Sequence, residues 1–227
     1  MKLAAATVMV TALLIAILLF GGSIAGKMLD SVGVLGNVRK YKTLTWKVIF
    51  PVDETATVQA MVLEPYYIRA ELPDGNIWLL DRREGKVILL NPAEKTAEVT
   101  FLKHKPPHIY DALSTFKYIS RLFCEKIGQR RIGQKEVIGF RLFKDNAGDD
   151  MVAWLDPQSR LPVRIEFLGT NERGRRVPVI IWSDIVFDIE LDEAVFKPDL
   201  TGYEVKELDS FRASYEYIDG FAARITR

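Results

Sequence analysis

The residues that could support metal chemistry are few and scattered along the chain. His104 and His108 are four residues apart, which is the spacing of a metal-binding pair on a helix. Pro106 and Pro107 stand between them and interrupt any helix, so we expect a loop at this point. The histidine pair therefore predicts no metal site.

Acidic and thiol groups give no stronger indication of catalysis. Asp145, Asp149 and Asp150 lie in a glycine-containing turn without the spacing of a calcium loop, so we expect a solvated loop. Cys124, the single cysteine, falls in an apolar pattern and is predicted to be a buried thiol. No G-x-S-x-G, P-loop or H-E-x-x-H motif occurs. The sequence thus predicts a protein without enzymatic activity, metal or cofactor.

Composition limits the kind of partner. The 227 residues carry 31 basic and 30 acidic side chains, a formal net charge of +1, with no concentrated basic face. This balance argues against nucleic acid as a partner. A single cysteine excludes an intrachain disulfide, so a hydrophobic core must hold the domain together, and 48% hydrophobic residues can supply one.

An apolar run near the amino terminus sets the expected compartment. Leu3–Phe20 contains no charged residue, and Lys2 precedes it. A helix of about 20 such residues spans a bilayer, with Lys2 on the cytoplasmic side. A secretory signal peptide cleaved after Ala25 is the alternative, but signal peptides usually have an apolar core of about 7–15 residues. The length favours a retained anchor over residues 1–26, followed by a linker over residues 27–42.

The rest of the chain is dominated by strand patterns separated by short turns. Two-residue alternation or short apolar runs indicate strands in ten segments. They are Thr43–Phe50, Thr55–Leu63, Tyr66–Leu72, Ile77–Asp81, Lys86–Asn91, Thr96–Leu102, Arg131–Val137, Ile138–Lys144, Met151–Leu155 and Pro162–Leu168, and a longer pattern follows at Val177–Ile189. Pro73-Asp74-Gly75-Asn76 and Arg82-Arg83-Glu84-Gly85 are predicted hairpin loops. This arrangement is typical of an antiparallel meander.

Two segments have helical periodicity instead. Apolar residues recur at helical spacing from Ile109 to Ile127, and Gly128 is placed to end such a helix. A C-terminal tail over residues 206–227 carries a second apolar stripe after Asp209, a possible N-cap.

Several predicted strands are apolar on both faces, notably Ile77–Asp81 and Lys86–Asn91. A sheet with one wet face alternates cleanly, so the second face needs a cover. The helix at 109–127 could provide it, a hydrophobic ligand could provide it, or helix and sheet could form an ordinary closed core. In the ligand hypothesis an apolar groove is lined by seven residues: Trp78, Leu80, Ile88 and Leu90 from the sheet, with Phe116, Ile119 and Phe123 from the helix. Trp46, Trp78, Trp154 and Trp182 are all predicted to lie in strands.

An ordered set of short motifs resembles a known superfamily. The set comprises Gly139-Phe140, Trp154-Leu155-Asp156-Pro157, Leu161-Pro162-Val163-Arg164, and Asp192-x-x-Val195-Phe196 before Gly202-Tyr203. Over roughly residues 43–205 the chain resembles the LolA/LolB-like superfamily of outer-membrane lipoprotein-sorting proteins. The resemblance implies a mainly β (α+β) fold, an incomplete antiparallel β-barrel with helices over its concave face. It also implies binding of lipid or lipoprotein acyl chains. No lipobox cysteine follows the apolar run, which favours a membrane-fixed role in lipid handling or sensing.

These observations lead to one functional hypothesis and one alternative. The hypothesis is non-catalytic binding of lipid or lipoprotein acyl chains in the bacterial cell envelope, by a single-pass inner-membrane protein with its main domain in the periplasm. If the apolar run is cleaved, the whole protein is periplasmic. The alternative is a structural or signalling ectodomain with a closed core that binds an envelope protein partner.

Overall fold

The computed structural model describes residues 38–51, 53–102, 113, 116–117, 123–143 and 150–208. The predicted anchor, most of the linker and the predicted helix after Asp209 lie outside these residues. Within the described part of the chain, none of the helices has the length and apolar character that a bilayer crossing requires.

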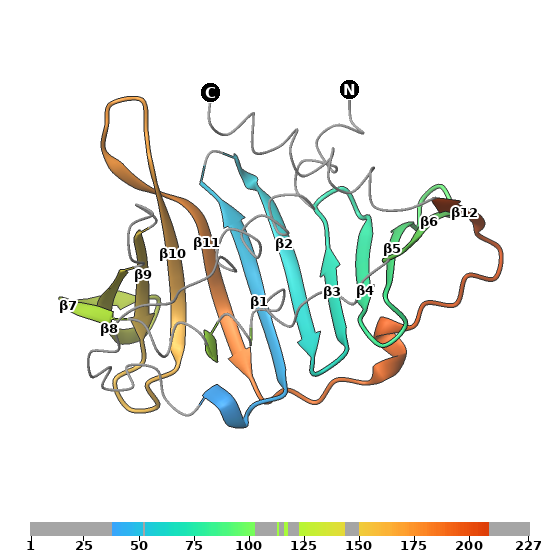
Figure 1. Cartoon of the computed structure of the whole chain (residues 1–227). Helices are drawn as coiled ribbons and strands as arrows, with labels where there is room; N and C mark the ends of the chain where they lie inside the picture. The colour runs from blue at the N-terminus through green and yellow to red at the C-terminus, as the bar shows by residue number, and fades with distance from the viewer. Residues whose placement is uncertain are drawn as a thin grey trace.

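The domain is built on one sheet of twelve strands (Figure 1). The strands are β1 (Thr43–Phe50), β2 (Asp53–Leu63), β3 (Tyr67–Glu71), β4 (Ile77–Asp81), β5 (Lys86–Asn91), β6 (Thr96–Phe101), β7 (Phe123–Ile132), β8 (Lys135–Phe143), β9 (Asp150–Leu155), β10 (Pro162–Thr170), β11 (Arg176–Phe187) and β12 (Glu204–Leu208). Two short 3-10 turns are also described, η1 (Val38–Lys40) and η3 (Glu193–Phe196). The predicted mainly β architecture is confirmed.

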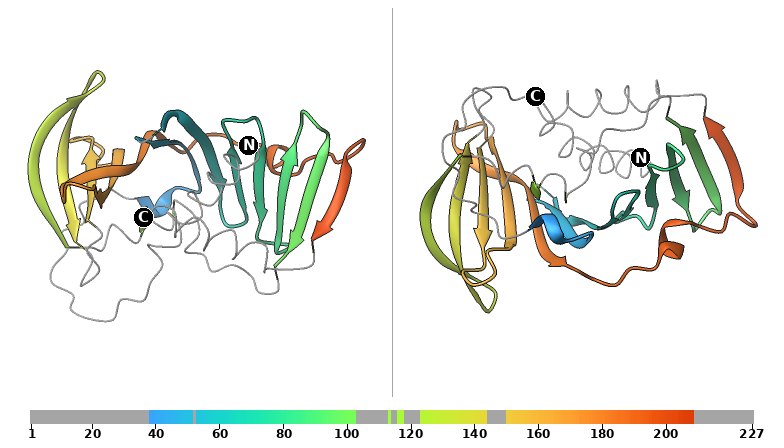
Figure 2. Two further views of the ribbon diagram at one scale, coloured as in Figure 1. Left: turned by 90° about the horizontal axis from the view of Figure 1, so that it is seen from above. Right: turned by 60° about the horizontal axis from the view of Figure 1, so that its bottom comes forward.

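The order of the strands divides the sheet into two meanders. It runs β12-β6-β5-β4-β3-β2-β1-β11-β10-β9-β8-β7, so β1–β6 and β7–β11 are each antiparallel neighbours in sequence. The pairing of β1 with β11 joins the two halves. The sheet is open, because β12 and β7 are its two edges. Figure 2 shows that both ends bend toward the same side, so the sheet has a concave and a convex face.

The loops between strands follow the turn chemistry of the sequence. Between β3 and β4, Gly75 has a φ of +83°, which costs glycine little, and Asp74 accepts a hydrogen bond from the Asn76 N–H at 3.0 Å. The hairpin predicted at Pro73–Asn76 is therefore confirmed, as are the strand bounds Ile77–Asp81 and Lys86–Asn91.

The helix predicted over residues 109–127 is wrong at its C-terminal end. Residues 123–127 belong to the strand β7, which pairs with β8 through Cys124↔Leu142. Gly128 does not end a helix but sits with a φ of +133° at a register shift in β7. The strand predicted at Arg131–Val137 is also wrong, because it contains the β7–β8 hairpin, in which Gly133 has a φ of +58°. Apolar residues of an irregular strand had mimicked helical spacing.

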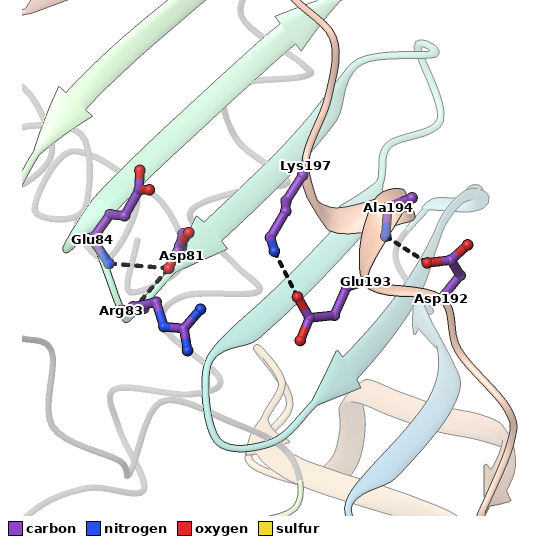
Figure 3. Close-up of polar contacts among 7 residues, drawn as sticks. All are labelled: Asp81, Arg83, Glu84, Asp192, Glu193, Ala194 and Lys197. Carbon is purple, nitrogen blue, oxygen red and sulfur yellow. Dashed lines mark hydrogen bonds and ion pairs between the residues drawn. The ribbon is translucent and has the colours of Figure 1, made fainter.

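The segment between β11 and β12, residues 188–203, was not predicted as an element and crosses the convex side of the sheet (Figure 2). Asp192 caps η3 by accepting a hydrogen bond from the Ala194 N–H at 2.9 Å, and Lys197 pairs with Glu193 at 2.6 Å (Figure 3). Arg69 of β3 donates to the Val195 carbonyl at 2.9 Å. We call residues 188–203 the strap.

The strap ends by adding a strand to the sheet. β12 pairs with β6 in parallel, with Glu204 opposite Thr96 and Leu208 opposite Thr100. The folded domain thus extends to Leu208, beyond the predicted boundary at residue 205, and the first three residues of the predicted tail are strand.

Candidate functional site

The sheet carries one continuous apolar surface on its concave side, which we call the inner face. Cross-strand pairing places Trp78 next to Ala70, Ala70 next to Ala60, and Ala60 next to Trp46. The same surface continues through the rest of the sheet to β8 and forms the main core cluster. Its buried strand residues are Leu44, Trp46, Val48, Val58, Ala60, Val62, Ile68, Ala70, Trp78, Leu80, Leu142, Met151, Ala153, Leu155, Ile165, Phe167, Ile180 and Trp182.

Trp78, Leu80 and Phe116 of the predicted groove are brought together on this inner face. Phe116 and Leu113 are both fully buried there. The Phe116 ring lies 5.6 Å from that of Trp182 in β11, in an edge-to-face arrangement. Their segment is tied to the β2–β3 connection by Lys117, whose ammonium lies 2.6 Å from the Glu64 carboxylate.

Ile88 and Leu90 must be removed from the predicted groove. In the β4–β5 hairpin Leu79 pairs with Ile88 and Ile77 with Leu90, whereas Trp78 pairs with Leu89. Ile88 and Leu90 therefore lie on the opposite, convex side, which we call the outer face, where Leu200 and Tyr203 of the strap pack against their cluster. They cannot line one groove with Trp78 and Leu80. Val87 and Leu89 take those places on the inner face.

Of the two remaining predicted lining residues, Phe123 does not belong to the expected helical plug. Phe123 begins β7 and pairs with Phe143, so it belongs to the edge strand. Ile119 lies outside the described residues.

Aromatic rings concentrate at the centre of the inner face. The ring of Trp182 lies 5.8 Å from that of Trp46 and 5.0 Å from that of Phe167. Phe187, which is partly buried, lies 5.6 Å from Phe116. These contacts join β1, β10, β11 and the 113–117 segment. Sequence reasoning placed Trp46 and Trp182 in strands but did not assign them to the candidate site.

The inner face contains little that ionises. The buried members of its cluster are all apolar. Cys124 packs against the cluster from β7, and burial raises the pKa of its thiol above the ordinary value of 9.0, which keeps it protonated at neutral pH. Across the described ranges no group of three His, Cys, Asp or Glu side chains is arranged to hold a metal ion. His104, His108, Asp145 and Asp149 lie outside those ranges.

A polar cluster occupies the outer face of β7–β10. The Arg130 guanidinium lies 3.7 Å from the ring centre of Trp154. Glu166 accepts hydrogen bonds on one oxygen from Arg130 at 2.6 Å and from Arg164 at 2.7 Å. Burial opposes ionisation of Glu166, but the two guanidinium groups outweigh it and hold the pKa of this carboxyl below its ordinary value of 4.5. The arrangement is structural, because every charged partner is already engaged.

Trp154 packs directly on a glycine. Gly139 of β8 pairs with Trp154 of β9, and a Cβ added to Gly139 would lie 2.6 Å from the indole ring and 2.9 Å from Ile127. The motif Gly139-Phe140 thus has a packing reason, since only glycine leaves room for the ring.

We expect Gly139→Ala to lower the free energy of unfolding by roughly 1–2 kcal/mol, because the ring must move away from the strand. Urea denaturation measures the loss. The double variant with Gly139→Ala and Trp154→Ala should lose less free energy of unfolding than the two single variants lose together, since the clash then disappears. Full additivity would contradict the packing explanation.

The comparisons with known proteins give structural neighbours only. No protein-family model matches the chain, and no curated protein sequence does. Among solved structures it is similar to an uncharacterised conserved protein from Thermus thermophilus, with 14% identity, a TM-score of 0.48, and coverage of 75% of this chain and 94% of that one. It is also similar to MucB, with 11% identity, a TM-score of 0.42, and coverage of 78% and 64%.

Members of the LolA superfamily are among these neighbours. One is the LolA superfamily protein of Nitrosomonas europaea, with 10% identity, a TM-score of 0.28, and coverage of 68% of this chain and 87% of that one.

Proposed function

We propose that the domain binds acyl chains of a lipid or lipoprotein on its inner face, without catalysis, in the bacterial cell envelope. The observation that carries this proposal is the continuous apolar surface from β8 to β5, which has no ionised member in its buried cluster. Acyl chains are recognised by burial of apolar area, and each methylene removed from water contributes about 0.8 kcal/mol.

The open sheet supports the same proposal. Because the edge strands β12 and β7 are not paired with each other, the two ends of the sheet can move apart without breaking a ladder of hydrogen bonds. Among the described residues, Leu113 and Phe116 pack over the inner face, and they would have to move to admit a chain. The predicted anchor at residues 1–26 would hold this site next to the membrane, and the resemblance of the sequence to LolA-like proteins implies the same class of ligand.

Binding can be tested with a fluorescent fatty acid titrated into the full chain. We expect saturable binding that Leu89→Gln weakens several-fold, because Leu89 is a partly buried residue of the inner face. Ile77→Gln is the matched control, since Ile77 is also partly buried but packs with the outer-face cluster of the adjacent strand. Equal weakening by both changes would move the site elsewhere.

The reactivity of the single cysteine gives an independent test of where the fatty acid binds. Cys124 packs against the inner-face cluster and is the only thiol in the chain. A bound fatty acid should slow its modification by a maleimide at alkaline pH. A protein that binds no fatty acid, and whose thiol reacts at an unchanged rate, would favour the alternative of a closed ectodomain that binds a protein partner.

A further inference from the structure

Among the residues that the structure describes, two indole N–H groups at the centre of the inner face have no hydrogen-bond partner. They belong to Trp46 and Trp182, whose side chains are both fully buried. Buried tryptophan normally finds an acceptor for its N–H, because an unsatisfied donor loses its hydrogen bond to water without compensation. A phenylalanine would fill much of the same space without this penalty.

The two donors are neighbours on one surface. β1 and β11 are hydrogen-bonded strands, Val48 pairs with Trp182, and Trp46 lies two residues from Val48 on the same face. The indole rings are 5.8 Å apart. The two rings are therefore close enough for one bound ligand to contact both.

The apolar surroundings of the two indoles determine which kind of hydrogen-bond acceptor can be buried beside them. Among the described residues the cluster around the indoles is apolar, and Lys117, which follows Phe116, is paired with Glu64. A phosphate or an ionised carboxylate would therefore be buried there without an available counter-charge. A neutral carbonyl has no charge that must be removed from water, and it accepts hydrogen bonds from neutral donors. An acyl ligand carries such a carbonyl at its ester linkage.

We propose that Trp46 and Trp182 are hydrogen-bond donors to the ester carbonyl groups of a bound diacylglyceryl lipid. The inference rests on the proposed function, since it places the ester linkage of the acyl ligand at the centre of the inner face. It makes the site selective for ester-linked chains over hydrocarbon of the same length.

The test compares an ester lipid with its ether analogue, which lacks the carbonyl oxygen. Dipalmitoyl phosphatidylglycerol and its di-O-hexadecyl analogue compete with a fluorescent fatty acid for the full chain. We expect the diester to bind about five- to tenfold more tightly, as for the loss of one or two neutral hydrogen bonds. Trp46→Phe and Trp182→Phe should each reduce the ratio between the two affinities.

Trp78→Phe is the matched control. Trp78 is buried in the same cluster, but its N–H is not among the buried donors without a partner. Whatever this variant does to the affinity for both lipids, it should keep the preference for the diester over the diether. Equal affinity of the unmodified protein for diester and diether, or a preference that survives in both the Trp46 and Trp182 variants, overturns the inference. If the diether binds as tightly as the diester, acyl-chain binding on the inner face stands and the inference about the ester carbonyl groups is wrong. If neither lipid binds, the proposed function and this inference are both wrong.

A spectroscopic readout avoids dependence on variants that fold poorly. The chain has four tryptophans, so a 15N-labelled sample gives four indole N–H signals in an NMR spectrum. The diester should shift two of them downfield, as expected for new hydrogen bonds, and the diether should not. A diacylglyceryl-cysteine peptide tested beside the phospholipid identifies which source of ester-linked chains the site prefers.

Discussion

Replacing Trp182 by alanine should lower the free energy of unfolding by about 3–5 kcal/mol, the largest loss expected from any single change considered. Trp182 is fully buried and its ring contacts those of Trp46, Phe116 and Phe167. Removing it leaves a cavity that three rings line, on strands whose pairing limits their collapse. Because domains are stable by only about 5–15 kcal/mol, much of the stability would be lost.

Urea denaturation of the full chain measures this effect. Val186→Ala is the matched control, since Val186 lies on the same strand, is half exposed, and should change stability by less than about 0.5 kcal/mol. A loss below about 1 kcal/mol for Trp182→Ala would mean that the centre of the inner face is not tightly packed.

The second large effect concerns Glu166 on the outer face. Glu166→Ala should lower the free energy of unfolding by about 2–3 kcal/mol at neutral pH, because it removes the acceptor of two charge-assisted hydrogen bonds. The figure stays modest because Arg130 and Arg164 are partly exposed and can be solvated.

The same carboxyl predicts a dependence on pH. The pKa of Glu166 is lower in the folded protein than its ordinary value of 4.5, so its contribution to stability is complete above that pH. The contribution is lost as the pH falls from about 4.5 through the lower folded value. Denaturation midpoints measured between about pH 7 and pH 3 should fall less steeply for Glu166→Ala than for the unmodified protein.

An exposed ion pair of the same region provides the control. Arg131 and Glu136 approach to only 3.9 Å, with both side chains more than two thirds exposed. Glu136→Ala should therefore leave stability at pH 7 almost unchanged. If the two glutamate variants change stability equally, the pairing of Glu166 with two guanidinium groups contributes no more to stability than an exposed ion pair.

Local sequence patterns predicted much of the sheet. Strands such as Ile77–Asp81 and Lys86–Asn91 were predicted with their observed bounds, because apolar runs ended at turns rich in Gly, Asp and Asn. The β7 strand was missed because Gly128 introduces a register shift, and the shift destroys two-residue alternation.

The error at Ile88 and Leu90 had a different origin, and the sequence contained the signal that corrects it. The hairpin loop at Arg82–Gly85 has an even number of residues and pairs Asp81 with Lys86. Even positions of β4 then face odd positions of β5. Trp78 and Leu80 therefore share a face with Leu89 and Val87. Hydropathy could not show this, because both faces of these strands are apolar.

The strap could not be predicted from local patterns, because its role depends on distant partners. Phe196 stacks on Tyr67, with ring centres 5.6 Å apart, across more than a hundred residues of chain. The sequence likewise could not show that the N–H groups of Trp46 and Trp182 lack a partner, since a single tryptophan in a strand pattern predicts only core packing. Both features arise from packing between elements that only the complete sheet brings together.

The pairing of β1 with β11 also constrains the order in which the chain can acquire its structure. Each meander consists of hairpins between sequence neighbours and can form as soon as its own residues are available. The junction between them joins residues 44–49 to residues 181–187, so it must wait for the last third of the chain and close a long loop. Until then, β1 and β11 each present an unpaired edge next to apolar side chains. Synthesis therefore exposes an aggregation-prone intermediate, which a chaperone would have reason to bind.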